Sequence, residues 1–257
     1  MIPSGNPAQV QPAGWSDAQA RFYAETIASS DYVERVVSLL PGPWPDVLDV
    51  GAGSGALVSR LVADGGRWLA VEPQPAMQDL LERLRPALAM RHVDLQVQPC
   101  TWQNLPPASR AAGLLAANVG ATHHQAAPFF DAVAARWTLS MRWVVSAQAG
   151  PSTFCLAGFL PAALHGADTQ PAFERALEQL GTTRQPDQVR FVDWHCRFTF
   201  ADESSAQAHF LDRLGLLPGT LQADEVCGYV HRHARHTTSG CEIGCDKRSA
   251  VLAWDRP

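Results

Sequence analysis

Three glycines and two carboxylates have types and spacings that suit the binding of a small ligand. Gly51, Gly53 and Gly55 alternate directly after an apolar run. Asp49 lies inside that run, and Glu72 closes the next one. Glycine lacks a Cβ and adopts positive φ, so a ligand can come close to the backbone at such a turn. A carboxylate in an apolar strand needs a hydrogen-bonding partner, and one at a strand end can accept bonds from two sugar hydroxyls.

The apolar pattern along the chain predicts alternating strands and helices that would position these residues. Strands are predicted over 47–50, 67–72, 92–98, 112–119, 142–147, 190–200 and 249–254. Helices are predicted over 15–40, 56–63, 75–88, 126–136, 173–180 and 204–216. This order indicates a doubly wound, Rossmann-like α/β fold: a mainly parallel sheet with helices on both faces and an antiparallel closing strand. The helix over 56–63 would point its first N–H groups at the glycine turn.

The domain organisation follows from composition. Residues 1–14 are rich in Pro, Gly and Gln and predict a flexible tail. Residues 15–257 predict a single domain with an inserted cap segment around 150–190, where the strand–helix rhythm changes.

Charge and hydropathy exclude several classes of partner. The formal net charge is −5 and no Lys/Arg run occurs, which argues against nucleic acid. No apolar run is long enough to span a membrane, and no signal peptide is evident. We therefore expect a cytoplasmic protein with reduced cysteines.

The glycine turn fits two classes of ligand. The pattern Gly51-x-Gly53-x-x-Ala56, followed by Glu72, suits a dinucleotide as well as S-adenosylmethionine. Three features favour the second. Asp49 lies where dinucleotide-binding strands are usually apolar, CTWQNLP (100–106) follows the third strand with polar and aromatic groups, and no second nucleotide-binding half follows residue 150.

Four motifs in order carry a family resemblance. They are LDVGAGSG (48–55), VEPQPAM (71–77), WQNLP (102–106) and AANVGATHH (116–124). With them the chain resembles the class I S-adenosylmethionine-dependent methyltransferases from about residue 15 to residue 149. The resemblance implies that fold, methyl transfer to a small-molecule acceptor, and S-adenosyl-L-methionine as cofactor.

The resemblance also implies roles for individual residues. The turn, Gly51, Ala52, Gly53 and Gly55 included, would hold the methionyl part, with Asp49 at its amino group and Glu72 at the ribose hydroxyls. The residues implied at the adenine are Pro73, Met77, Thr101 and Trp102. Thr101 stands where many relatives carry an acidic residue. Asn118 would lie near the reactive methyl, and Tyr23 would belong to a helix that folds over the site.

Histidines provide the candidates for a general base. His123 and His124 follow the fourth predicted strand, and imidazole titrates near neutral pH. A hydroxyl acceptor would need such a base, whereas a thiolate or free amine would not. The acceptor pocket is predicted between the N-terminal helix and residues 150–166, which are apolar and interrupted by Gly and Pro.

The C-terminal part supports two alternative functions. A non-catalytic cofactor- or metal-binding protein could use the cysteines and histidines Cys227, His231, His233, His236, Cys241 and Cys245. Their spacing does not form a compact zinc knuckle, so we expect an antiparallel hairpin and no metal. An NAD(P)-dependent oxidoreductase would need a catalytic pair such as Tyr/Lys, and Lys247 is the lone lysine.

Overall fold

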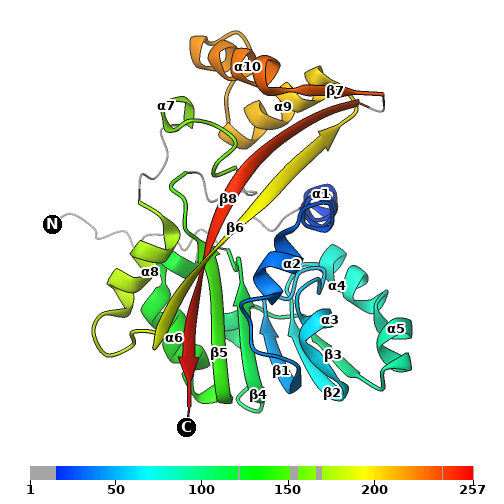
Figure 1. The fold of residues 1–257 in the computed structure, drawn as a ribbon, viewed down its shortest axis with the longest axis vertical. Helices are drawn as coiled ribbons and strands as arrows, with labels where there is room; N and C mark the ends of the chain where they lie inside the picture. The colour runs from blue at the N-terminus through cyan, green and yellow to red at the C-terminus, as the bar shows by residue number, and fades with distance from the viewer. Residues whose placement is uncertain (1–15, 121, 151–155, 166–169, 239, 257) are drawn as a thin grey trace, which may run out of the picture.

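A single sheet organises the computed structural model, which describes residues 16–120, 122–150, 156–165, 170–238 and 240–256. The predicted tail over 1–14 lies outside these residues. Among them, eight strands form one sheet: seven lie in the order β3-β2-β1-β4-β5-β8-β6, and the eighth, β7, pairs with β8 (Figure 1). The strands are β1 Trp44–Val50, β2 Val62–Val71, β3 Asp94–Gln98, β4 Ala111–Ala117, β5 Trp137–Ser146, β6 Gln188–Phe200, β7 Arg235–Thr237 and β8 Gly240–Asp255.

Strand direction confirms the predicted fold class. The pairs β1–β2, β2–β3, β1–β4 and β4–β5 are parallel, whereas β8 is antiparallel to both β5 and β6. The chain leaves β1 toward β2 and β3 and later returns on the other side of β1 to form β4. Ligands of open α/β sheets bind at such a switch point, outside the carboxyl ends of the strands.

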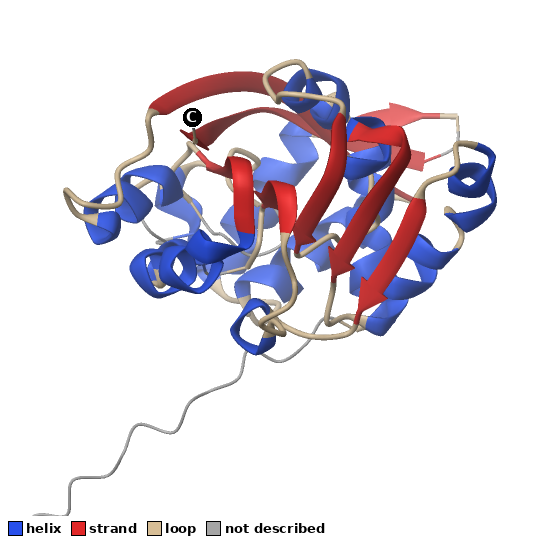
Figure 2. Cartoon of the chain, turned by 90° about the horizontal axis from the view of Figure 1, so that it is seen from below, coloured by secondary structure: helices blue, strands red, loops and turns tan. Residues whose placement is uncertain are grey.

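Helices cover both faces of the sheet (Figure 2). Side chains of β1 alternate between two buried clusters: Val47 packs in one with Trp68, and Leu48 in the other with Leu114. The helices are α1 Asp17–Ala28, α2 Tyr32–Val37, α3 Val58–Leu61, α4 Pro75–Glu82, α5 Arg85–Met90, α6 Ala126–Val133, α7 Ala162–His165, α8 Ala172–Leu180, α9 Glu203–Leu214 and α10 Leu221–His233. No helix of the described ranges has both the length and the apolar character required to cross a bilayer.

Two predicted helices are broken into shorter ones. The segment predicted as one helix over 15–40 contains α1 and α2. Between them Ser29 Oγ donates to Thr26 O at 3.1 Å and Ser30 Oγ to Ile27 O at 2.8 Å. Such side-chain bonds compete with the helical ladder. The helix predicted over 75–88 is divided into α4 and α5 at Arg83 and Leu84.

The helix after the glycine turn is much shorter than predicted. Instead of extending over 56–63, it is the single turn α3, and β2 begins at Val62. The guanidinium of Arg91 donates to Ser59 O at 2.7 Å and to Val62 O at 2.6 Å. These side-chain bonds satisfy carbonyls that the backbone N–H groups of a longer helix would have bonded. The predicted length of this helix is therefore wrong, although a helical turn still follows the glycine turn.

Strands β6 and β8 continue far beyond the rest of the sheet. Strand β5 pairs with β8 no further than Ser249, whereas β6 pairs with it as far as Cys241. We call residues 193–200 and 240–248, together with α9, α10 and β7, the hairpin extension; it forms the upper part of Figure 1. Phe198 of this extension stacks on Phe159, with the ring centroids 4.0 Å apart.

Helix α10 corrects the prediction of a hairpin over 227–245. Its first turn is capped by Thr220, whose hydroxyl accepts from Ala223 N, and Val226 and Val230 are buried at helical spacing. The hairpin starts only at Arg235. Residues 150–190, predicted as an inserted cap, include α7, α8 and the beginning of β6 in their described parts.

Candidate functional site

The glycine turn lies at the carboxyl end of β1 and has the positive φ values that favour glycine. The angles are 70° at Gly51, 56° at Gly53 and 77° at Gly55. Gly51 N donates to Val71 O at 2.8 Å, and Ala52 N donates to the same carbonyl at 3.1 Å. These bonds fix the turn against the end of β2.

The three glycines serve different purposes. A Cβ on Gly55 would lie 2.5 Å from the Trp68 ring, and one on Gly51 would lie 2.8 Å from Val119. These two glycines therefore allow close packing. At Gly53 a Cβ would meet no atom within 4 Å. Gly53 thus borders open space, as a loop that cradles a ligand requires.

Glu72 is held against this turn. Its side chain is buried, Oε2 accepts from Gly53 N at 2.8 Å, and Oε1 accepts from Gln74 N at 2.8 Å. Burial raises the pKa of Glu72, and the two backbone N–H groups lower it. Each carboxylate oxygen keeps a lone pair, so this group can also accept bonds from neighbouring hydroxyls.

Asp49 is the second buried carboxyl group, 4% exposed. Burial raises its pKa to about 8; the indole N–H of Trp68 opposes this rise and the charge of Glu72 adds to it. The Trp68 Nε1 atom is buried and forms no hydrogen bond of ordinary geometry. At neutral pH Asp49 is therefore protonated in the free protein, and a bound cation would favour its ionised form.

Asn118 directly follows β4, beside the glycine turn. Its φ is 52°, a conformation that asparagine tolerates better than most residues. Its backbone N donates to Val144 O at 2.9 Å, and its Nδ2 donates to Tyr32 Oη at 2.9 Å. This contact of Tyr32 could not be predicted from the sequence, because the place of Tyr32 in an apolar helical pattern indicated packing alone.

The residues expected at the adenine lie on two elements. Pro73 is exposed just before α4, whereas Met77 is buried against Ala20 of α1. Tyr23 packs on the same cluster, so α1 lies across α4.

Thr101 and Trp102 lie at the end of β3. This end is fixed to β2 because Glu72 N donates to Gln98 O at 3.0 Å. Trp102 begins a short 3-10 helix, is half-buried, and meets Phe129 edge to face with ring centroids 5.4 Å apart. Both residues thus follow a parallel strand at its carboxyl end, as the glycine turn does.

The two candidate bases differ in exposure. His123 and His124 belong to a 3-10 turn, η2 Thr122–His124, that packs against α8. Their rings are 4.1 Å apart, His123 is buried, and His124 is exposed. Both follow Asn118 on the connection from β4 to α6.

The cysteines and histidines of the C-terminal part are dispersed over the hairpin extension. His231 Nδ1 lies 2.9 Å from Glu203 Oε1, His236 Nε2 lies 3.3 Å from Glu203 Oε2, and His233 stacks on Tyr229. In the part of the chain that the structure describes, no group of three or more such side chains could hold a metal ion.

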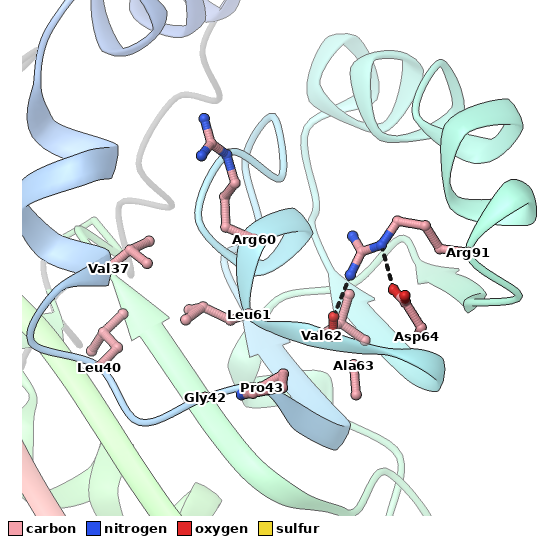
Figure 3. Close-up of a pocket in the computed structure, with 10 residues that line it drawn as sticks. All are labelled: Val37, Leu40, Gly42, Pro43, Arg60, Leu61, Val62, Ala63, Asp64 and Arg91. Atoms are coloured by element: carbon pink, nitrogen blue, oxygen red, sulfur yellow. Dashed lines mark hydrogen bonds and ion pairs between the residues drawn. The ribbon is translucent and has the colours of Figure 1, made fainter.

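Two cavities lie away from the glycine turn. One, of about 480 Å³, is at the amino ends of β1 and β2, where Arg91 bonds Val62 and Asp64 (Figure 3). The other, of about 490 Å³, lies between α7 and α10 and is lined by residues such as Leu164 and Tyr229. Neither is lined by the candidate site residues.

Comparison with known proteins identifies the fold. No family model and no curated protein matches the sequence. The solved structure of the mycolic acid cyclopropane synthase CmaA1 is similar with a TM-score of 0.52 and 14% identity, over 93% of this chain and 99% of that one. The chain has the class I methyltransferase fold. The resemblance that the motifs predict is thereby confirmed for the fold.

Two further solved structures are similar at lower scores. The geranyl diphosphate C-methyltransferase from Streptomyces coelicolor A3(2), in complex with Mg²⁺, geranyl diphosphate and S-adenosyl-L-homocysteine, has a TM-score of 0.43 and 14% identity over 93% of this chain and 79% of that one. YcgJ from Bacillus subtilis has a TM-score of 0.49 and 13% identity over 86% of this chain and 97% of that one.

Proposed function

We propose that this methyltransferase-fold protein transfers the methyl group of S-adenosyl-L-methionine to a small-molecule acceptor. The observation that carries the proposal is the pair of buried carboxyl groups, Asp49 and Glu72, at the open turn of Gly53. The turn lies at the switch point of the sheet, where this fold class binds its ligands.

The donor set fits this cofactor. Glu72, with its oxygens already oriented by two backbone N–H groups, would accept bonds from the ribose hydroxyls. Asp49 would face the ammonium group of the methionyl part, and Gly53 leaves room for that part. Pro73, Met77, Thr101 and Trp102 would surround the adenine, and Tyr23 would help α1 to cover the site.

The chemistry requires little of the protein beyond positioning. The cofactor supplies an activated sulfonium methyl group, so orientation of the two reactants and exclusion of water provide most of the acceleration. For a hydroxyl acceptor, His123 or His124 would take the proton. The acceptor pocket stays a prediction between α1 and the segment 150–166, of which residues 151–155 and 166 lie outside the described part of the chain.

The oxidoreductase alternative gains no support at the site. Lys247, the lone lysine, is buried in the hairpin extension, where its ammonium group lies 4.9 Å from the centre of the Phe159 ring. The ammonium group also donates a hydrogen bond to Ala157 O, so Lys247 has structural contacts in this part of the molecule.

Replacement of Glu72 tests the proposal. We expect Glu72→Gln to weaken the binding of S-adenosylhomocysteine more than about tenfold, because charge-assisted hydrogen bonds are lost. The control is Asp79→Asn, which removes an exposed carboxylate from α4 and should leave the affinity unchanged. Equal affinities of the Glu72 variant and the wild type, measured by calorimetric titration, would refute the proposal.

A further inference from the structure

One hydrogen bond connects the candidate site with the N-terminal helices. Asn118 Nδ2 donates to Tyr32 Oη at 2.9 Å, across 86 residues of sequence. Tyr32 is 2% exposed, and its ring meets Trp194 of β6 edge to face at 4.7 Å. Burial and the contact with Trp194 therefore restrict the position of the phenol ring.

The residue before Tyr32, Asp31, also holds the start of α2 in place. Asp31 Oδ1 accepts from His195 N of β6 at 2.6 Å, and Arg35 binds the other carboxylate oxygen at 3.0 Å. Thus the start of α2 is anchored to β6 through Asp31 and to the end of β4 through Tyr32.

The bond to Tyr32 occupies the amide nitrogen of Asn118 and leaves the amide oxygen able to accept a hydrogen bond. Nδ2 is engaged by the phenol oxygen, and Oδ1 has no hydrogen-bond partner among the described residues. The next residue, Val119, lies against Gly51, so the chain reaches the glycine turn one residue after Asn118. An unengaged amide oxygen at this place is a hydrogen-bond acceptor for a ligand in the turn.

We propose that Tyr32 is a positioning residue: it holds the Asn118 amide so that Oδ1 accepts a hydrogen bond from the ammonium group of the methionyl part. This inference rests on the proposed function. It adds a second acceptor to the one that Asp49 provides, and it makes recognition of that part depend on the docking of α2.

The test compares two ligands on one variant. S-adenosylhomocysteine has the amino-acid part, and 5′-methylthioadenosine lacks it. For Tyr32→Phe we expect about fivefold weaker binding of the first ligand, the loss typical of one hydrogen bond, and unchanged binding of the second. Tyr229→Phe, a substitution in α10 within the hairpin extension, is the matched control and should bind both ligands as the wild type does.

A second variant removes the other partner. Asn118→Gly suits the positive φ at this position and deletes the amide, so it should reproduce the selective loss even if the Tyr32 variant folds poorly. The double variant with Tyr32→Phe should bind S-adenosylhomocysteine as weakly as Asn118→Gly alone. Without the Asn118 amide, Tyr32 has nothing left to position.

The outcomes separate this inference from the proposed function. If the wild type does not bind S-adenosylhomocysteine, the proposed function fails. If the wild type binds it and the Tyr32 and Asn118 variants bind equally well, or lose both ligands alike, the positioning role of Tyr32 is refuted.

Discussion

At the scale of single residues, the protonation of Asp49 is the property that a ligand should change most. The group is protonated at neutral pH because burial raises its pKa to about 8. An ammonium group bound beside it would lower that pKa, so binding should release about one proton at pH 7. Since the ionised form binds, affinity should rise between pH 6 and pH 8.

Titration calorimetry in buffers with different ionisation enthalpies measures this proton. Asp49→Asn keeps the shape of the side chain and cannot ionise, so it should bind S-adenosylhomocysteine more weakly and release no proton from this position. An equal release from the variant and the wild type would show that Asp49 does not face the ammonium group.

At the scale of one element, alanine substitutions in and outside the glycine turn distinguish the effect of backbone strain from the effect of a lost ligand contact. Gly53 and Gly65 both have positive φ, and neither would bring a Cβ within 4 Å of another atom. An alanine at either position should lower the free energy of unfolding by about 1 kcal/mol through strain. Only at Gly53 does the new methyl group enter the space proposed for the cofactor.

Chemical denaturation and ligand titration of the two variants check this prediction. Gly53→Ala and Gly65→Ala should be destabilised alike, whereas Gly53→Ala alone should lose affinity for S-adenosylhomocysteine. Equal affinity in both variants would place the ligand elsewhere.

The same element shows what sequence could predict. The turn and Asp49 were predictable because adjacent residues in one strand–turn unit determine their geometry, and Glu72 because it closes the next parallel strand. The shortness of α3 was not, because it depends on the guanidinium of Arg91, far along the chain. The bond between Tyr32 and Asn118 depends likewise on tertiary packing across 86 residues. Helix α10 was missed because its histidines and cysteines obscured the buried positions Ala223, Val226 and Val230.

At the scale of the whole molecule, α1 connects α4 with the hairpin extension. It packs on α4 through Ala20 and on the extension through Phe22, whose ring lies 4.6 Å from that of His209. Burial lowers the pKa of His209 to about 4, with Arg213 adding to the effect and Asp212 opposing it. The neutral imidazole therefore stabilises the fold fully above pH 6.5, and this contribution is lost as the pH falls through 4.

His209→Phe should make the protein less sensitive to acid. The wild type should lose more thermal stability than the variant between pH 7 and pH 5, because the variant has no group to protonate among these aromatic rings. The control is His233→Phe on the exposed side of α10, which should behave as the wild type. Thermal unfolding followed by circular dichroism measures the difference, and parallel pH profiles for all three proteins would contradict the assigned role.

Binding of S-adenosyl-L-methionine at the turn of Gly53, with Asp49 and Glu72, is the property on which the other binding predictions depend. It is tested by calorimetric titration of the wild-type protein with S-adenosylhomocysteine and, in parallel, with NADH and NADPH. We expect a dissociation constant in the micromolar range, about −8 kcal/mol, for the first ligand and no binding of the other two. Binding of a nicotinamide cofactor instead, or of none of the three, would contradict it.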